Sequence, residues 1–320
     1  MRAVRAAHGA VAVHDVPPPA GNGVRVNVRA AGICGSDLHL LAVDGLVPPT
    51  RTLGHEIAGV TDDGTPVAIE PLAPCDECPP CRRGDYHLCV LSGGMLFGVG
   101  LDGGMADQIV VPERTIVRLP AGVDVSDASL VEPLAVLMHS VRQVDIRPTD
   151  RVAVIGGGTI GLCAVAAVRA RGARCDLVAR HEAQRAAGAR LGATEIDAAA
   201  SGVDGDYDVV IEAAGTDSAL ADAVELARPG GRIVIPGIYW GPVTIPGMAM
   251  CLKEVSLCPT TLYGRHAGGR DVDAAAALLA TTPDLARSVI THRFPLAAAD
   301  EAFATAADRQ AGAIKVVLEP

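Results

Sequence analysis

The sequence has few aromatic residues and almost no lysine. Aromatic side chains make up 2% of its 320 residues, and only Lys253 and Lys315 among its 27 basic residues are lysines. The cores of the protein must therefore be built from alanine, valine, leucine and isoleucine. Since the sequence is 49% hydrophobic and 20% charged, it predicts a globular protein, and its length favours two domains.

The sequence also lacks a long apolar run, a signal peptide and an excess of positive charge. No apolar run reaches the length needed to span a membrane, and residues 1–5 do not lead into the apolar core of a signal peptide. The formal net charge of −10 argues against nucleic acid as a partner, because phosphate binding requires a clustered positive surface. We therefore expect a cytoplasmic protein with neither a membrane nor a nucleic acid as partner.

Four of the nine cysteines are packed into one short segment rich in proline and glycine. Their spacing, C-x2-C-x2-C-x7-C, is typical of a closed four-cysteine zinc site, which stabilises a loop that has no core of its own. An iron–sulfur cluster is the competing interpretation, but no electron-transfer motif accompanies the segment. The predicted ligands of this structural zinc ion are Cys75, Cys78, Cys81 and Cys89.

A second group of metal-ligand residue types lies in the motifs Cys-Gly-Ser-Asp-x-His and Gly-His-Glu. Catalytic zinc sites combine three protein ligands, drawn from thiolate, imidazole and carboxylate groups, with one open position. The sequence offers Cys34, His55 and either Glu56 or the later Glu132 for these places. Taken singly, Cys34 could be a buried thiol and His55 a core histidine, but the pairing of the two motifs favours a metal.

Three polar residues of the first motif have predicted roles beside the metal. Asp37 could accept the second N–H of the ligand His55 and so fix its tautomer; otherwise it caps a loop. Ser36 and His39 could pass a proton from a buried alcohol to solvent, and the alternative is a turn hydroxyl and a surface imidazole. We predict the catalytic roles for all three residues.

The middle of the chain predicts a dinucleotide-binding fold. An apolar strand at 152–155 is followed by a glycine-rich turn and by an alanine-rich helix that ends near Arg171. A GxGxxG motif between a strand and a helix allows the pyrophosphate to approach the N-terminus of the helix. The predicted cofactor-binding residues of this turn are Gly156, Gly158, Thr159, Ile160 and Gly161.

The next strand, at 176–180, ends without the acidic residue that NAD-specific folds use to bind the adenosine ribose. Ala179 and Arg180 occupy this end, followed by His181. A carboxylate would repel a 2′-phosphate, whereas an arginine would pair with it. The sequence therefore predicts that Arg180 selects NADP(H) over NAD(H); the alternative is an arginine that only solvates the surface.

Together these motifs resemble the zinc-containing medium-chain dehydrogenase/reductase superfamily, which includes the alcohol and polyol dehydrogenases. The resemblance extends over essentially the whole chain and implies an α/β fold with two domains. Residues 1–134 and 271–320 would form a β-rich, GroES-like catalytic domain, in which residues 75–89 form the structural zinc lobe. Residues 135–270 would form a Rossmann domain with a doubly wound parallel sheet.

The resemblance also implies roles for residues outside these motifs. Glu132, in a Glu-Pro pair, stands where alcohol dehydrogenases have a cysteine ligand. The sorbitol and threonine dehydrogenase branch shares this feature, and there both Glu56 and Glu132 can approach the metal. Gly215 and Gly237 would line the nicotinamide half of the cofactor, and Lys315 would contact its pyrophosphate. Relatives pair through an edge of the cofactor-domain sheet, so we expect a homodimer or a homotetramer.

The implied activity is hydride transfer between NADP(H), or NAD(H), and a small alcohol or carbonyl substrate whose oxygen a zinc ion polarises. Polyol dehydrogenases commonly carry a tyrosine after the relay histidine and an arginine before a late tyrosine. This chain has Leu40 and Leu262 at these places, which favours a less hydroxylated substrate. The alternatives are a polyol or sugar dehydrogenase that uses NAD(H), and a non-catalytic protein that binds zinc and nucleotide.

Overall fold

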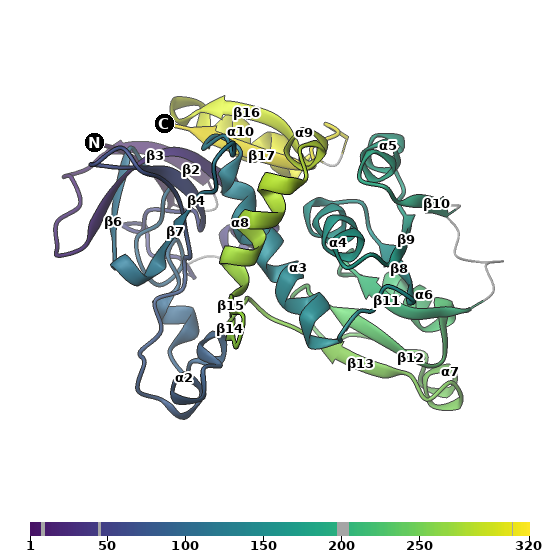
Figure 1. Ribbon diagram of the computed structural model, residues 1–320. Coiled ribbons are helices and arrows are strands. Elements are labelled where there is room, and N and C mark those ends of the chain that lie inside the picture. The colour runs from purple at the N-terminus through teal and green to yellow at the C-terminus, as the bar shows by residue number, and fades with distance from the viewer. Residues whose placement is uncertain (8–9, 44–45, 197–204, 309) are drawn as a thin grey trace. The chain divides into compact units, whose positions relative to one another are not determined.

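The computed structural model describes residues 1–7, 10–43, 46–196, 205–308 and 310–320. The chain divides into two compact units (Figure 1). Unit 1 comprises residues 1–132, 264–281 and 290–320, and unit 2 comprises residues 133–263 and 282–289. Relative to the predicted division, residues 264–270 belong to unit 1 and residues 282–289 to unit 2. The latter contain helix α9 (Asp284–Val289), which packs against two helices of unit 2, α4 (Thr159–Ala170) and α5 (Glu182–Arg190).

Unit 1 is rich in β-structure. Its strands are β1 (Arg2–Ala7), β2 (Ala10–Asp15), β3 (Val24–Ile33), β4 (Glu56–Thr61), β5 (Pro66–Ile69), β6 (Gln108–Val111), β7 (Ile116–Arg118), β14 (Arg265–His266), β15 (Gly269–Arg270), β16 (Ile290–Pro295) and β17 (Lys315–Glu319). Seven of them form one sheet, in the order β16-β17-β3-β4-β5-β7, with β6 paired to β3. The sheet is mixed, because β16 and β17 are parallel while the other neighbours are antiparallel.

Strand β3 is central to this sheet and leads to the first metal motif. Val26 and Val28 are buried in the core of unit 1, and they alternate with the more exposed Asn27 and Arg29. The strand then continues through four buried residues to Ile33. It therefore ends immediately before the motif that begins with Cys34.

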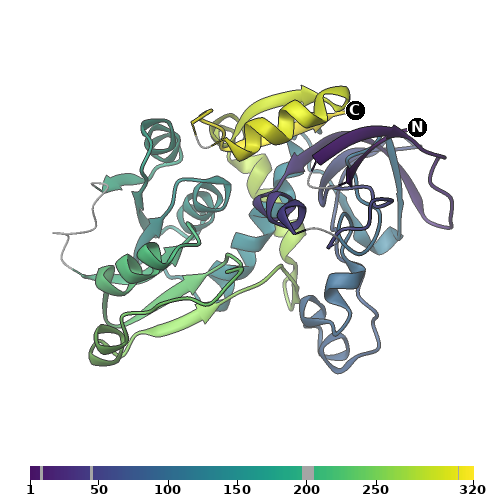
Figure 2. The same ribbon diagram turned by 180° about the vertical axis from the view of Figure 1, so that it is seen from behind.

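The C-terminal segment completes the sheet of unit 1. Strand β17 pairs with β3, and Val316 lies opposite Ile33. Helix α10 (Ala299–Ala307) packs against β17 and β2, so residues from the two ends of the chain share one core. Figure 2 shows this arrangement, with the yellow C-terminal helix and strands beside the purple N-terminal strands.

The remaining helices of unit 1 are short. They are α1 (Gly35–Ala42), α2 (Pro79–Arg83), α8 (Asp271–Thr281) and the 3-10 helices η1 (Tyr86–Leu88), η2 (Ser92–Met95), η3 (Glu113–Thr115), η4 (Ala128–Leu130) and η5 (Leu296–Ala298). Helix α1 follows β3 directly and carries the first metal motif. Helices α2 and η1 lie between the clustered cysteines.

Unit 2 contains a six-stranded parallel sheet. Its strands are β8 (Arg151–Ile155), β9 (Arg174–Val178), β10 (Thr194–Ile196), β11 (Tyr207–Glu212), β12 (Ala227–Ile235) and β13 (Ser256–Pro259), in the order β10-β9-β8-β11-β12-β13. Its other helices are α3 (Val131–Gln143), α6 (Asp217–Leu226) and α7 (Gly247–Leu252). The chain runs outward from β8 to β10 and then returns to β11. This change of direction at β8 is the switch point of a doubly wound sheet, where ligands bind.

Helix α3 starts at Val131, immediately before the Glu-Pro pair. Pro133 lies in its first turn, where a proline is tolerated because that N–H has no partner inside the helix. The glutamate of the Glu-Pro pair therefore lies on a helix and not in a loop.

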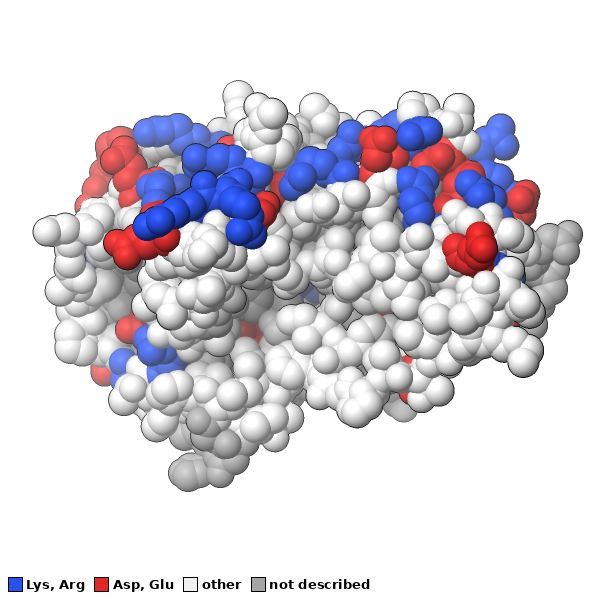
Figure 3. Space-filling model, turned by 90° about the horizontal axis from the view of Figure 1, so that it is seen from below, with Lys and Arg blue, Asp and Glu red and all other residues white. Residues whose placement is uncertain are grey.

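The surface carries mixed charge. Figure 3 shows Lys and Arg side chains lying close to Asp and Glu side chains, with uncharged surface between these groups. Among the residues that the structure describes, no helix is both long enough and apolar enough to cross a membrane.

Candidate metal centres and nucleotide site

The first candidate centre is organised by the N-terminus of α1. Cys34 is the N-cap residue, and its backbone N–H donates to Oδ2 of Asp37 at 2.9 Å. The Asp37 N–H donates in turn to the Cys34 carbonyl oxygen at 3.0 Å. Because this exchange fixes the first turn of the helix, it also fixes the direction of the Cys34 thiol. Asp37 therefore acts as the cap of α1, and its role beside a metal stays a prediction.

His55 reaches the same place from the start of β4. Gly54 before it has a φ of +93°, and a side chain there would collide with Met105. The His55 ring is buried, and its Nδ1 lies 3.4 Å from Oδ1 of Asp37. With Nδ1 directed toward this carboxylate, Nε2 is left for a metal, which is the arrangement that metal-binding histidines usually adopt.

Cys34, His55 and Glu56 together form a group that can hold a metal. One ligand atom from each residue lies within 4.8 Å of the others. Thiolate, imidazole and carboxylate are the donors that zinc takes in proteins. Nδ1 of His55 and Oδ1 of Asp37 face each other in this buried site. The residues therefore fit a zinc ion.

Electrostatics at His55 point the same way. Burial alone would lower the pKa of His55, but the charges and hydrogen bonds of Asp37 and Cys34 outweigh it and hold the pKa well above the usual value. The environment is therefore one that stabilises a positive charge. Glu132 is also buried, but it is not a member of the group of three.

Glu56 has a partner that the sequence analysis missed. Nζ of Lys315 donates to Oε1 and Oε2 of Glu56 at 2.6 and 2.7 Å and to the Ile33 carbonyl oxygen at 2.8 Å. The Lys315 side chain is 3% exposed. Its three hydrogens are directed to acceptors inside unit 1. In the structure Lys315 compensates Glu56, and contact between Lys315 and the cofactor pyrophosphate stays a prediction.

The place of Glu56 depends on a glycine in the neighbouring strand. Gly32 lies opposite Glu56 in the β3–β4 ladder, and a Cβ atom at Gly32 would lie 1.9 Å from Oε2 of Glu56. The glutamate side chain therefore occupies the space above a residue that has no side chain. One signal for this pair is present in the sequence, since Lys315 is one of two lysines and stands in an apolar strand.

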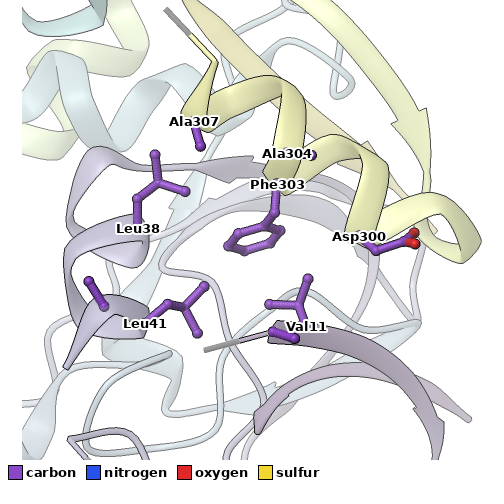
Figure 4. Close-up of a pocket in the computed structure, with 9 residues that line it drawn as sticks. Val11, Leu38, Leu41, Asp300, Phe303, Ala304 and Ala307 are labelled. Carbon is purple, nitrogen blue, oxygen red and sulfur yellow. The ribbon is translucent and has the colours of Figure 1, made fainter. Parts of the chain in front are cut away.

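Apolar residues of α1 line a cavity inside unit 1. A cavity of about 500 Å³ lies between α1, β2 and α10. Leu38, Leu41, Val11 and Phe303 point toward one another across it (Figure 4). None of the predicted site residues lines this cavity, so the helix presents its functional residues elsewhere. Ser36 is partly buried, and the exposed His39 has its Nδ1 2.8 Å from the Gly35 carbonyl oxygen.

The four clustered cysteines form a second, closed group. Their sulfur atoms lie within 4.8 Å of one another, and three of the pairs are 3.4, 3.5 and 3.9 Å apart. A disulfide would require about 2.05 Å, whereas a tetrahedron with Zn–S bonds of about 2.3 Å has edges of about 3.8 Å. Backbone N–H groups of Cys81 and Val90 lower the pKa of Cys78 to about 6, which favours a thiolate. The group fits a four-coordinate zinc ion.

The zinc lobe is attached to unit 1 through a buried carboxylate. The Tyr86 hydroxyl, between the third and fourth cysteine, donates to Oε1 of Glu70 in a short hydrogen bond. Arg270 donates to Oε2 of the same carboxylate at 3.0 Å. Burial raises the pKa of Glu70, which these two donors partly offset. The lobe thus has a fixed connection to β5 and to the segment before α8.

In unit 2 the predicted glycine-rich turn joins β8 to α4. Gly156 has a φ of +106°, Gly158 is the N-cap of α4, and Thr159 and Ile160 are the first residues of that helix. A Cβ atom at Gly161 would lie 1.7 Å from the Gly156 carbonyl oxygen. The helix can therefore pack against the strand only if this position is glycine, and the N-terminus of a helix at this place is suited to binding an anion.

Arg180 follows the end of β9, next to this turn. A Cβ atom at Gly157 would lie 2.8 Å from Cβ of Ala179, so the two segments are in contact. Arg180 itself is exposed. Nη1 of Arg185 donates to the carbonyl oxygens of Ala179 and Arg180 at 3.3 and 3.0 Å, which stabilises the bend.

Asp176 cannot replace the missing acidic residue at the end of β9. It lies two residues before the last residue of the strand, and its Oδ2 accepts the Tyr207 hydroxyl at 2.9 Å.

The carboxyl ends of β11 and β12 contain the other two predicted glycines. Gly215, with a φ of +68°, ends the turn after β11, and Gly237 follows β12. Sequence analysis assigned no role to Glu212, which is completely buried. The sequence feature that could have indicated a role for Glu212 is the acidic residue at the end of the apolar run Val209-Val210-Ile211.

Comparison with known proteins gives the family. Residues 20–121 match the alcohol dehydrogenase GroES-like domain, and residues 125–319 match the glucose dehydrogenase C-terminus. The L-galactonate-5-dehydrogenase of Escherichia coli K12 is 32% identical over 314 residues, with 90% of this chain and 89% of that protein covered. The chain belongs to the zinc-type medium-chain alcohol and polyol dehydrogenase superfamily.

Solved structures of similar proteins support the same family. A zinc-binding dehydrogenase of Sinorhizobium meliloti 1021, bound to NADP, is 30% identical with a TM-score of 0.86, covering 100% of this chain and 99% of that one. An alcohol dehydrogenase of Escherichia coli CFT073, complexed with NADH, is 26% identical with a TM-score of 0.86 and the same coverage. The predicted family and α/β fold are thereby confirmed.

The enzyme class follows from the family. This medium-chain dehydrogenase is a zinc-dependent NAD(P) oxidoreductase that acts on CH–OH groups, and its four clustered cysteines form a structural zinc site. The alternative of a non-catalytic protein loses its support.

Proposed function

We propose that this medium-chain dehydrogenase transfers hydride between NADP(H) and a small alcohol or its carbonyl counterpart. The observation that carries the cofactor preference is the end of β9, where Ala179 and the exposed Arg180 stand in place of an acidic residue. An arginine at this point can pair with a 2′-phosphate, and Asp176 is already bonded to Tyr207. One structural relative is bound to NADP, as its name states.

In the proposed reaction the residues of α1 and β4 hold the catalytic metal and move one proton. Zinc bound there supplies a Lewis acid that polarises the substrate oxygen. Cys34 and His55 are the proposed protein ligands, with Glu56 or Glu132 as the third, and Asp37 orients the His55 ring. Ser36 and the exposed His39 are proposed to conduct the alcohol proton from the buried site to solvent.

Gly215 and Gly237 are proposed to border the nicotinamide half of the cofactor, and the turn from Gly156 to Gly161 to hold its pyrophosphate. The strand order supports this division, because the two halves of a dinucleotide lie on either side of the switch point next to β8. The adenosine half then lies at β9, beside Arg180.

Two substrate classes are favoured by different observations. Leu40 packs against the core of unit 1, and Leu262 stands where polyol dehydrogenases commonly have an arginine. Both residues favour a sparsely hydroxylated alcohol or ketone. The name of the relative L-galactonate-5-dehydrogenase favours instead a polyhydroxylated substrate, and this is the second candidate.

The test of the cofactor proposal compares kcat/KM for NADP+ and NAD+ in the native protein and in Arg180→Ala. Loss of a charge-assisted hydrogen bond to phosphate costs about 1.5–3 kcal/mol, so the NADP+ value should fall roughly 10- to 100-fold while the NAD+ value stays within about twofold. Arg174→Ala, at the opposite end of β9, is the control and should change neither value. A native preference for NAD+ would refute the proposal.

The substrate proposal is tested in the same preparation, after its zinc content has been measured. A panel of simple secondary alcohols and of sugar alcohols and sugar acids is assayed with the preferred cofactor. Turnover of the polyhydroxylated compounds alone would replace the first substrate class by the second.

A further inference from the structure

A buried carboxylate in unit 2 has no part in the proposed reaction so far. Glu212, the last residue of β11, is completely buried. Its Oε1 accepts the N–H groups of Ala214 and Gly215, each at 2.8 Å, and its Oε2 accepts the Tyr239 hydroxyl at 2.6 Å. All three partners are neutral donors, and no ion pair to Glu212 is found among the described residues. Because all three groups donate, the glutamate acts only as an acceptor, as an ionised carboxylate does.

Glu212 connects the turns at the carboxyl ends of neighbouring strands. Ala214 and Gly215 belong to the turn after β11, and Tyr239 to the turn after β12. The first turn also packs against the glycine-rich turn after β8, since a Cβ atom at Gly156 would lie 3.0 Å from the Ala214 nitrogen. One carboxylate therefore fixes the edge of the sheet on the side of the switch point away from β9. If β9 receives the adenosine half, this edge receives the nicotinamide half.

Tyr239 has its hydroxyl hydrogen committed to this contact. Burial, followed by the hydrogen bond and the charge of Glu212, raises the pKa of Tyr239. The hydroxyl donates its hydrogen to Glu212. Its position depends on the carboxylate behind it.

A purely structural link would not require a charge. A glutamine at this position could accept hydrogen bonds in a similar shape, and burying a charge costs folding free energy unless the charge is well compensated. A negative charge at this edge has one chemical consequence. It stabilises the positively charged oxidised nicotinamide relative to the neutral reduced one.

We propose that Glu212 is a positioning residue for the nicotinamide half of the cofactor, acting through Tyr239, and that its charge favours binding of the oxidised cofactor over the reduced one. This inference rests on the proposed function of the site. It concerns the relative affinity for the oxidised and the reduced cofactor, which is determined neither by the family nor by the choice between NADP(H) and NAD(H).

The experiment measures the Kd of zinc-replete protein for NADP+ and NADPH by titration calorimetry. Two unit charges about 10 Å apart in a medium with an effective dielectric of about 20 change an equilibrium roughly tenfold. Glu212→Gln should therefore change the ratio of the two Kd values roughly tenfold in favour of NADPH. Glu212→Asp retains the charge and should retain the ratio. Tyr239→Phe should weaken both forms at least threefold and leave the ratio unchanged.

A control and two outcomes decide the proposal. Asp208→Asn removes a negative charge at the other end of the same strand, about 13 Å away, and should change both Kd values by less than twofold. A ratio unchanged in folded Glu212→Gln overturns the proposal. If Glu212→Gln does not fold, Tyr239→Phe decides, because Kd values within twofold of the native ones overturn the positioning role. Failure of the native protein to bind either nicotinamide dinucleotide would instead refute the proposed function.

Discussion

The buried pair formed by Lys315 and Glu56 gives the sharpest prediction for stability. Lys315→Met removes a cation that donates to both oxygens of a carboxylate and leaves that carboxylate in the core of unit 1. Breaking a buried ion pair in this way costs about 3–5 kcal/mol, because the remaining charge is desolvated without a partner. We expect a loss of this size in the free energy of opening of β3 and β17.

Native-state hydrogen exchange is the suitable assay, because a chain with two compact units and a structural zinc site need not unfold in a single transition. The double variant Lys315→Met/Glu56→Gln should recover at least half of the loss, because no uncompensated charge remains. Lys253→Met is the matched control. Lys253 donates to three backbone carbonyl oxygens of unit 2, and its loss should leave the exchange of β3 and β17 unchanged.

The reasoning fails if Lys315→Met lowers the opening free energy by less than about 1 kcal/mol, or if the double variant is no better than the single one. Either result would mean that Glu56 is compensated by another group when the protein is folded. The pair would then be a consequence of packing rather than a requirement of the site.

Two further predictions concern the surroundings of the proposed catalytic metal. Gly32→Ala should displace the Glu56 carboxylate and lower the melting temperature. Gly35→Ala is the control and should have almost no effect, because an added Cβ atom there meets no atom within 4 Å. Equal melting temperatures of the two variants would contradict the close contact at Gly32. Asp37→Asn retains an acceptor for the cap of α1 but loses the charge beside His55. The zinc affinity measured by chelator competition should therefore fall about 10- to 100-fold, while the circular dichroism spectrum stays unchanged. An unaltered zinc affinity would argue against Asp37 as the partner of His55.

The parts of the fold with local sequence signals were predictable. The glycine-rich turn between β8 and α4 follows from glycine spacing between an apolar strand and an alanine-rich helix. The four-cysteine group follows from its spacing, because ligands this close in sequence need little else to bring them together. The strand at β3 follows from alternation. Each of these signals lies within about twenty residues, so a single chain is enough to reveal it.

The interactions that the sequence did not reveal join distant segments. The partner of Glu56 lies 259 residues further along the chain, and no local pattern pairs a lysine in β17 with a glutamate in β4. The resemblance to relatives suggested only a pyrophosphate contact for Lys315 and gave no indication of its pairing with Glu56. Glu212 ends β11 and Tyr239 follows β12, 27 residues further along the chain, and the adjacency of these strands becomes visible only with the sheet order.

Because of these long-range contacts, the residues of the first metal motif depend on distant parts of the chain for their positions. Cys34 lies at the start of α1 and His55 just before β4, but the carboxylate beside them is paired with Lys315, which reaches it from β17. The final strand of the chain is therefore a component of the site and not only of the sheet. Because an uncompensated buried carboxylate is costly, the arrangement of Cys34, His55 and Glu56 is coupled to the docking of the C-terminal segment. Chemistry that the sequence concentrates in residues 34–56 thus depends on a strand near residue 315.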